Sequence, residues 1–334
     1  MINDEIVPAQ VNAHEHVIAG FWTRILALFV DGLILGAFGL LLGFFFSDTL
    51  MRMAGLGRFI GLLTAVLYFG LLNSSIGNGQ TLGKRACKIR VVNRDNEWIP
   101  LDLSFARAFV LWLPFTLNGM MLPQGVVGVP FLSVLLGILV FGGMGAIVYL
   151  YVFNRKTRQS LHDLAVGTYV VRASTTGRLE IPRIWKGHLV ITGAYCALVI
   201  IVITVLVPII SKNSVFSQFV SLQNSITSSG KAYSVSVMEN NFTSIVGGNK
   251  RAENHLVVTA FTKGKPVSPQ NLASEIAAIV LKDCPEVFSK DRLIIRITYG
   301  YDIGIASFSK SYADSKTPNE WTEVLKTSSK EAAI

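Results

Sequence analysis

Charged side chains are scarce in this sequence, at 15% of its 334 residues, whereas a soluble globular chain carries about 25%. Apolar residues reach 51% and gather in long runs before residue 211, while the tail from 211 to 334 has ordinary soluble composition. The shortage of charge therefore excludes a wholly soluble protein. It predicts two kinds of domain, one in a membrane and one in water.

Cysteine and histidine are also rare, with three and five residues. The cysteines form neither a disulfide framework nor a C-x-x-C pair. His14 and His16 flank Glu15, but no third ligand follows at metal-binding spacing. Residues 77–85, GNGQTLGKR, lack the Ser or Thr that follows the lysine of a phosphate-binding loop. We therefore predict no metal, no cofactor and no enzyme, because no catalytic constellation is recognisable.

Long apolar runs divide the first part of the chain into segments of membrane-spanning length, which is about 20 residues. The weakest run contains Arg107 and Pro114. We expect about five transmembrane helices, within Ile25 to Phe46, Phe59 to Ile76, Phe105 to Leu122, Val126 to Phe153 and Leu189 to Ile210.

The basic residues predict the orientation of these helices. The net charge of +9 does not indicate nucleic-acid binding, because most Lys and Arg before residue 211 lie in two polar loops, 84–94 and 155–186. Both loops should be cytoplasmic, and so should the N-terminus. Residues 1–23 contain acids but no Lys or Arg, so the first helix should be an anchor and not a cleaved signal. Five spans then place the tail outside, in a multi-pass protein of a cell inner membrane.

The expected fold is an all-α polytopic membrane bundle with a small α+β C-terminal soluble domain. Alternating strands are predicted at 231–238, 255–262, 293–299 and 303–309, with helices at 268–284 and 319–326. Two β-branched stretches, 88–93 and 166–172, predict a small sheet that ties the cytoplasmic loops together. The domains are a cytoplasmic segment at 1–17, a membrane domain at 18–173, a linker with the fifth helix at 174–211 and an extracytoplasmic domain at 212–334.

Three motifs within residues 17–173 resemble the RDD family, which is named for one arginine and two aspartates. They are AGFWTR leading into LFVD at 19–31, QTLGKR and KIRVV at 80–92, and HDLAVGT at 162–168. Val166 stands where the family usually has alanine. The resemblance implies a membrane protein whose Arg24, Asp31 and Asp163 are the family residues. Most members are uncharacterised, and cation/proton antiport has been proposed for some.

Asp31 lies well inside the first apolar run, where a charged side chain costs about 2.5 to 3.5 kcal/mol. It should therefore face protein or a watery cavity and have a partner. Arg24 lies two helical turns earlier on the same face, so the two can share a polar groove without touching. Asp31 is interpreted either as a proton or cation carrier tuned by Arg24 or Arg107, or as a structural link. Arg24 is better explained as an interfacial residue.

His162 and Asp163 follow a basic stretch at the cytoplasmic surface. The pair can relay protons or accept Arg24 as an ion pair, but the stronger interpretation is that Asp163 caps a short segment or fastens the loop. Glycines recur every three or four residues along the first helix and predict close packing with another helix or with a second copy. They are Gly32, Gly36, Gly39 and Gly43.

Two functions from different classes follow from these features. The first is a membrane carrier of small cations, in which Asp31 and Asp163 exchange protons. The second is a non-transporting scaffold or sensor that anchors an extracytoplasmic binding domain. The partners implied are membrane lipids, a second copy of the chain in a homo-oligomer and an extracytoplasmic protein, but no nucleic acid.

Overall fold

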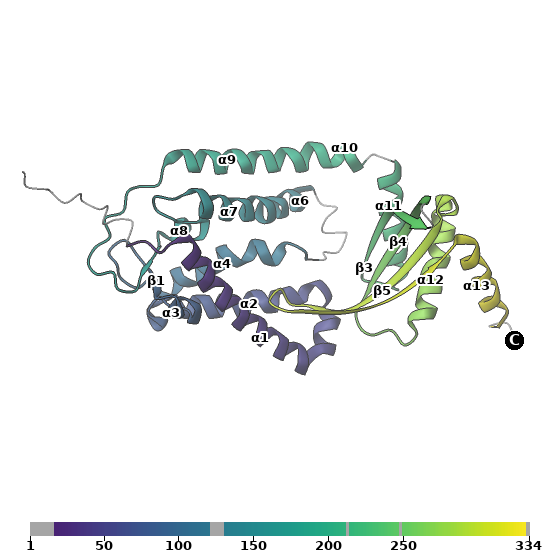
Figure 1. Ribbon diagram of the computed structural model, residues 1–334, viewed down its shortest axis with the longest axis horizontal. Coiled ribbons are helices and arrows are strands. Elements are labelled where there is room, and N and C mark those ends of the chain that lie inside the picture. The colour runs from purple at the N-terminus through teal and green to yellow at the C-terminus, as the bar shows by residue number, and fades with distance from the viewer. Residues whose placement is uncertain (1–16, 121–129, 212–213, 247–248, 332–334) are drawn as a thin grey trace, which may run out of the picture. The chain divides into compact units, whose positions relative to one another are not determined.

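A computed structural model describes residues 17–120, 130–211, 214–246 and 249–331 of the protein (Figure 1). The predicted N-terminal segment, including His14, Glu15 and His16, lies outside the described residues apart from Val17. The chain divides into two compact units. The first unit comprises residues 1–38, 59–118 and 134–200, and the second comprises residues 39–58, 119–133 and 201–334.

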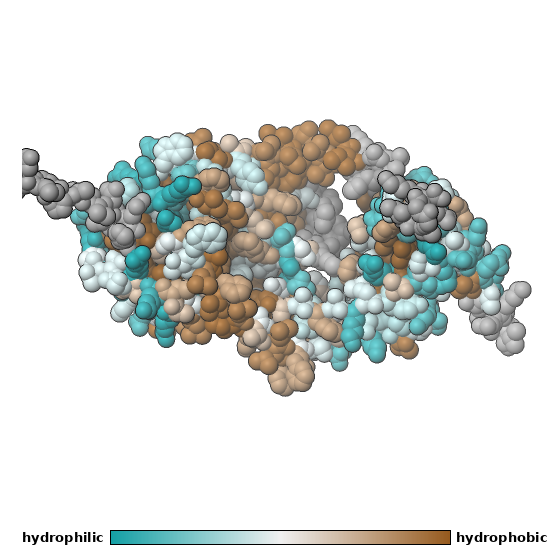
Figure 2. Space-filling model, in the orientation of Figure 1, coloured by the Kyte–Doolittle hydropathy of each residue, from teal (hydrophilic) through white to brown (hydrophobic). Residues whose placement is uncertain are grey.

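Most of the helices are apolar around their whole circumference, as expected where lipid and not water is the solvent. Exposed large apolar side chains are common on them, and Figure 2 shows such side chains most densely along α9 and α10. The helices of this apolar part are α1 (Phe21–Met53), α2 (Arg58–Leu72), α4 (Leu101–Leu117), α6 (Pro130–Gly137), α7 (Gly143–Phe153), α9 (Lys186–Ile201) and α10 (Val207–Ser211).

Three helical stretches among the described residues are long and apolar enough to cross a membrane: Phe21–Leu72, Phe131–Phe153 and Lys186–Ile210. The first contains both α1 and α2, joined by a 3-10 turn at Ala54–Gly57. α4 has 17 residues and contains Pro114, so it is shorter than a standard span. The described residues therefore confirm a helical membrane region, but they do not confirm the predicted number of about five crossings.

A two-stranded sheet links the two basic loops, as the β-branched stretches predicted. β1 (Ile89–Val92) pairs antiparallel with β2 (Tyr169–Arg172), with Val91 opposite Val170. Short helices precede the strands, α3 (Leu82–Ala86) before β1 and α8 (Leu161–Val166) before β2. The backbone N–H of Ala19 donates to the Val170 carbonyl at 2.9 Å, which attaches the segment before α1 to the same sheet.

The tail forms an α+β domain around a four-stranded sheet of order β3-β4-β5-β6. β4 and β5 are parallel, which requires the crossover through α12, and the other two pairings are antiparallel. The elements are α11 (Ser214–Ser228), β3 (Ser234–Val246), β4 (Asn249–Thr262), α12 (Pro269–Asp283), β5 (Arg292–Asp302), β6 (Ser307–Lys316) and α13 (Pro318–Glu331).

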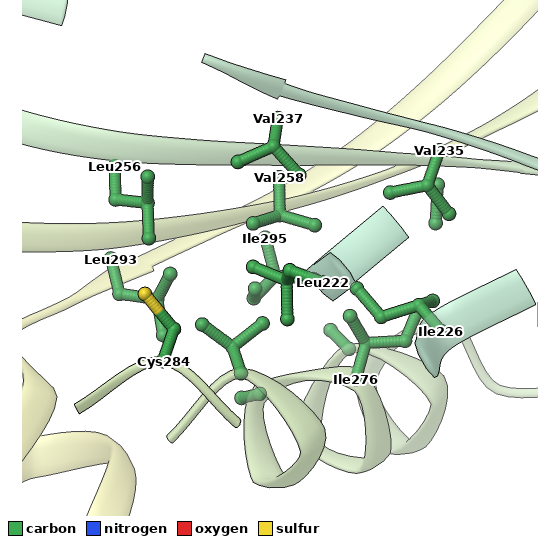
Figure 3. Close-up of a cluster of buried hydrophobic side chains, with 14 of the residues drawn as sticks. Leu222, Ile226, Val235, Val237, Leu256, Val258, Ile276, Cys284, Leu293 and Ile295 are labelled. Carbon is green, nitrogen blue, oxygen red and sulfur yellow. The ribbon is translucent and has the colours of Figure 1, made fainter. Parts of the chain in front are cut away.

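The core of the tail lies between the sheet and its helices (Figure 3). Ile276 of α12 and Ile226 of α11 meet Val258 of the sheet, and all three are fully buried. Trp321 of α13 is also buried, and its indole N–H donates to the Leu293 carbonyl at 2.9 Å. That bond satisfies the polar atom of a large apolar side chain, which makes the burial favourable.

Two helices of the tail confirm the sequence prediction, and one strand corrects it. Ser268 caps α12 by accepting the Asn271 N–H at 3.2 Å, as the Ser-Pro pair indicated. The strand predicted at 303–309 starts too early, because residues 303–306 form the turn between β5 and β6 and the strand β6 begins at Ser307. Gly304 adopts a φ of +78° there, and Asp302 Oδ1 accepts its N–H at 2.8 Å. The helix α11 was not predicted.

The glycines of α1 have different surroundings in the structure. A Cβ at Gly32 would meet no atom within 4 Å, whereas one at Gly43 would collide with the ring of Tyr301. Gly43 and Tyr301 both belong to the second unit, where Arg58 Nε also donates to Asp302 Oδ2 at 2.9 Å. Gly43 therefore leaves space for the Tyr301 ring of the β5–β6 hairpin, where we had expected another helix or a second copy of the chain.

Gly43→Leu should loosen this hairpin, because the new side chain occupies the space of the Tyr301 ring. Hydrogen–deuterium exchange of residues 300–308 in detergent should rise several-fold. Gly32→Leu is the matched control on the same helix and should leave that exchange unchanged. Equal exchange in both variants would contradict the packing described for Gly43.

Candidate functional site

Asp31 lies in the middle of the apolar helix α1, yet its side chain is fully buried. Three groups donate hydrogen bonds to its carboxylate: the Tyr68 hydroxyl at 2.7 Å, the Thr81 hydroxyl at 2.6 Å and the Gly83 backbone N–H at 2.8 Å. The expectation that Asp31 faces protein is confirmed. Its partners are neutral donors, and Arg24, the expected neighbour, is not among its described hydrogen-bond partners.

The loop between α2 and β1 delivers two of these donors. Thr81 caps α3 by accepting the Lys84 N–H at 3.3 Å, and the same hydroxyl donates to Asp31. Position 83 requires a glycine, because a Cβ there would collide with the Ala27 carbonyl and the Asp31 carboxyl. The glycine thus lets the backbone of the loop touch α1, which brings its N–H within reach of the carboxylate.

Asp163 lies in a second polar cluster, with two guanidinium groups. Arg24 Nη2 donates to Oδ2 at 2.7 Å, and Arg107 donates to Oδ1 through Nη2 at 2.6 Å and Nε at 3.0 Å. The carboxylate also forms a capping box with Ser160 at the start of α8. All four side chains are buried. Both expected roles of Asp163, partner of Arg24 and helix cap, are therefore present together.

The charge state of Asp163 follows from this environment. Burial alone would raise the pKa of its carboxyl, but positive charge outweighs that effect, on His162 when it is protonated and on Arg107 and Arg24. The pKa of Asp163 is thus held well below its usual range. A carboxylate fixed in the charged form by two guanidinium groups is suited to holding structure and poorly suited to exchanging protons.

His162 follows the opposite rule. Its imidazole is buried, and desolvation lowers its pKa to about 3, with Arg107 and Arg24 adding to the effect against the attraction of Asp163. Its Nε2 lies 3.6 Å from Asp163 Oδ1. Among the described residues, no group is within hydrogen-bond distance of its Nδ1. His162 is therefore neutral at physiological pH.

Lys84 is a member of the site that the sequence did not indicate. We had counted it only among the basic residues of a cytoplasmic loop, but its side chain is buried and its Nζ donates to Asn73 Oδ1 at 2.8 Å. Its ammonium also lies over the ring of Phe69. Burial lowers the pKa of Lys84 to about 7, with the charge of Arg107 adding to the effect and Asp31 opposing it. This lysine changes charge near neutral pH.

A cavity of about 420 Å³ connects the two clusters inside the first unit. Asp31, Lys84, Arg24, Arg107 and His162 all contribute to its wall. Arg24 and Asp31 therefore share one cavity without a direct contact, as their spacing on α1 predicted. Most of the remaining lining is apolar and comes from α1, α4 and α7. In the described part of the chain, no group of His, Cys, Asp and Glu could hold a metal ion.

Removing the charge of Asp163 should destabilise the membrane unit, because two buried guanidinium groups would lose their counter-ion. Asp163→Asn should lower the free energy of unfolding by roughly 3 to 5 kcal/mol. The measurement is thermal unfolding in detergent. Asp95→Asn is the control, since Asp95 pairs with Arg178 on the surface and both side chains are more than half exposed. A wild-type melting temperature for Asp163→Asn would disprove the structural role.

Acid should also weaken the fold through His162. The unfolded imidazole has the ordinary pKa of 6.5 and the folded one about 3, so the unfolded state binds more protons between these values. Stability should therefore fall as the pH drops from 6.5 toward 3, by at most about 1.4 kcal/mol per pH unit from this group. Unfolding in detergent across this range should show a shallower slope for His162→Asn. An unchanged slope would exclude a buried neutral histidine.

The comparisons with known proteins concern the part of the chain that contains this site. Residues 18–167 match the model of the RDD family, and this range contains every charged residue of the two clusters. The uncharacterized protein YckC of Bacillus subtilis is 29% identical over 164 residues, which cover 49% of this chain and 89% of the relative. The uncharacterized protein YxaI of the same organism is 28% identical over 134 residues, 34% of this chain and 85% of the relative. No solved structure matches the chain. Residues 18–167 are therefore an RDD-family domain.

Proposed function

We propose that the RDD domain exchanges a small cation for a proton, with Asp31 and Lys84 as the exchanging groups. One observation carries this proposal: a buried carboxylate and a buried amine of opposite charge line the same cavity within a helical membrane region. Ionisable groups at such depth are costly, and they mark ion or proton pathways in membrane proteins.

The exchange follows from electrostatics. A cation that enters the cavity is attracted to the Asp31 carboxylate, and its charge makes the nearby ammonium of Lys84 less favourable. Because the pKa of Lys84 is already near 7, the lysine then releases its proton. Binding the proton again expels the cation by the same coupling, since linkage between two sites is reciprocal. One positive charge enters as one leaves, so the cavity keeps its net charge.

The remaining charged groups serve this pair as a frame. Asp163 is held by Arg24 and Arg107 and keeps its charge, so it positions the cavity without exchanging protons. Asp31 instead has only neutral hydrogen-bond donors among its described partners, which stabilise a carboxylate without neutralising it. Its negative charge therefore stays available to an incoming cation.

The topology that suits this function is the one the basic loops predict. About five spans, with the loops at 84–94 and 155–186 and the N-terminus in the cytoplasm, place the tail outside an inner membrane. The exchanging pair then lies toward the cytoplasmic ends of the helices, because Lys84 belongs to the first of these loops. Five spans supply few helices for the walls of a pathway, so we propose that two or more copies of the chain assemble.

Reconstituted flux tests the proposal. Liposomes with purified protein and an internal pH dye should show a pH change when a gradient of Na⁺ or K⁺ is imposed. Asp31→Asn and Lys84→Gln should each lower the rate at least tenfold. Arg85→Gln is the matched control, since Arg85 follows Lys84 on α3 but is exposed, and it should keep the wild-type rate.

Folded wild-type protein without any ion-driven pH change would contradict the carrier. It would favour the second function, a scaffold whose membrane domain anchors the tail. Site-specific crosslinking from the tail to an extracytoplasmic protein would then be the positive observation for that alternative.

A further inference from the structure

Away from its charged groups, the wall of the cavity is apolar. Apolar side chains from three helices make up most of it. These side chains include Ile25 and Leu28 of α1, Leu111 and Phe115 of α4, and Ile147 and Val148 of α7. Large apolar linings with a few convergent polar groups are typical of sites for apolar or amphipathic ligands.

The polar end of the same cavity has more positive than negative groups. Arg24, Arg107 and Lys84 line it, against Asp31 as the one lining carboxylate and Asp163 behind the two arginines. The Lys84 ammonium has three N–H groups, and Asn73 is its one hydrogen-bond acceptor among the described residues. This end therefore has donors and positive charge to spare, which favours an anionic group.

Two further polar atoms of the lining have no hydrogen-bond partner in the described part of the chain. They are the indole Nε1 of Trp112 and Nδ1 of His162, whose side chain is only 5% exposed. A buried polar atom without a partner costs about 1 to 3 kcal/mol. Such atoms persist where a ligand completes the hydrogen bonds, and an indole N–H can only donate, so it requires an acceptor.

We propose that this cavity binds a long-chain carboxylate, a single-chain amphiphile of the fatty-acid class. The carboxylate lies at the end formed by Lys84 and Trp112, and the chain lies along the apolar walls of α1, α4 and α7. The cavity volume of about 420 Å³ is near the lower end of ligand pockets, which span about 300 to 1,000 Å³, so one chain suits it better than a two-chain phospholipid. The proposal does not depend on ion exchange.

Binding to the full-length protein tests this inference. In nanodiscs of phosphatidylcholine, isotope-labelled palmitate should bind at least tenfold more tightly than its methyl ester, because only the free acid presents an anion to Lys84. The comparison uses the wild-type protein and therefore does not depend on whether a variant folds. Equal binding of acid and ester would overturn the proposal, and so would displacement of palmitate by a small excess of phosphatidylglycerol.

Two matched pairs of variants locate the site. Leu111→Trp should fill the cavity and abolish palmitate binding, while Leu103→Trp, an exposed position of the same helix outside the cavity, should not. Lys84→Gln should weaken palmitate about tenfold or more, since a hydrogen bond to a charged group is lost, and Arg85→Gln should not. Undiminished palmitate binding in folded Leu111→Trp would place the ligand elsewhere and refute the site.

Discussion

The ion cluster of Asp163 with Arg24 and Arg107 is the interaction on which the membrane domain depends. It joins the first turn of α1, the middle of α4 and the loop helix α8, three segments that are far apart in the sequence. Removing three charges from water is costly, and the cost is offset only when the hydrogen bonds are nearly complete. Here the carboxylate accepts hydrogen bonds from both guanidinium groups and from the Ser160 backbone N–H, which favours this arrangement of the three segments.

The two family aspartates illustrate how surroundings decide the role of one chemical group. Both are fully buried carboxylates, but Asp163 is neutralised by cations, whereas Asp31 is held by two hydroxyls and a backbone amide. Pairing with two guanidinium groups neutralises the charge of a carboxylate. Neutral donors stabilise the carboxylate but do not cancel its negative charge. The first arrangement suits a frame and the second suits a group that attracts a ligand.

The sequence predicts these residues better than it predicts their contacts. The cost of a charged side chain in lipid correctly predicts that Asp31 is buried within the protein. The Ser268-Pro269 pair correctly predicts the start of α12. The burial of Lys84 was missed, because counting loop charges gives topology and not tertiary contacts. Such a count cannot show that Gly83 packs against α1 and that the next residue is buried. Tyr68 and Thr81 were missed for the same reason: their link to Asp31 spans 37 and 50 residues and depends on tertiary structure. The strand predicted at 303–309 starts only at Ser307, because the alternating pattern continues through a turn at Gly304.

A single loop connects the ion cluster of Asp163 to Asp31 and Lys84. Residues 74–83 are fastened to β1, where the Val91 N–H donates to the Gly79 carbonyl at 2.8 Å and the Gln80 amide donates to the Ile89 carbonyl at 2.9 Å. β1 pairs with β2, which follows α8 and Asp163, and Asp163 returns to α1 through Arg24. The same loop carries Thr81 and Gly83, and Lys84 follows it directly. Any displacement of it would therefore remove donors from Asp31 and change the burial of Lys84 in one movement. The charge of Lys84 and the hydrogen bonding of Asp31 are therefore coupled, because the same short segment contacts Asp31 and buries Lys84.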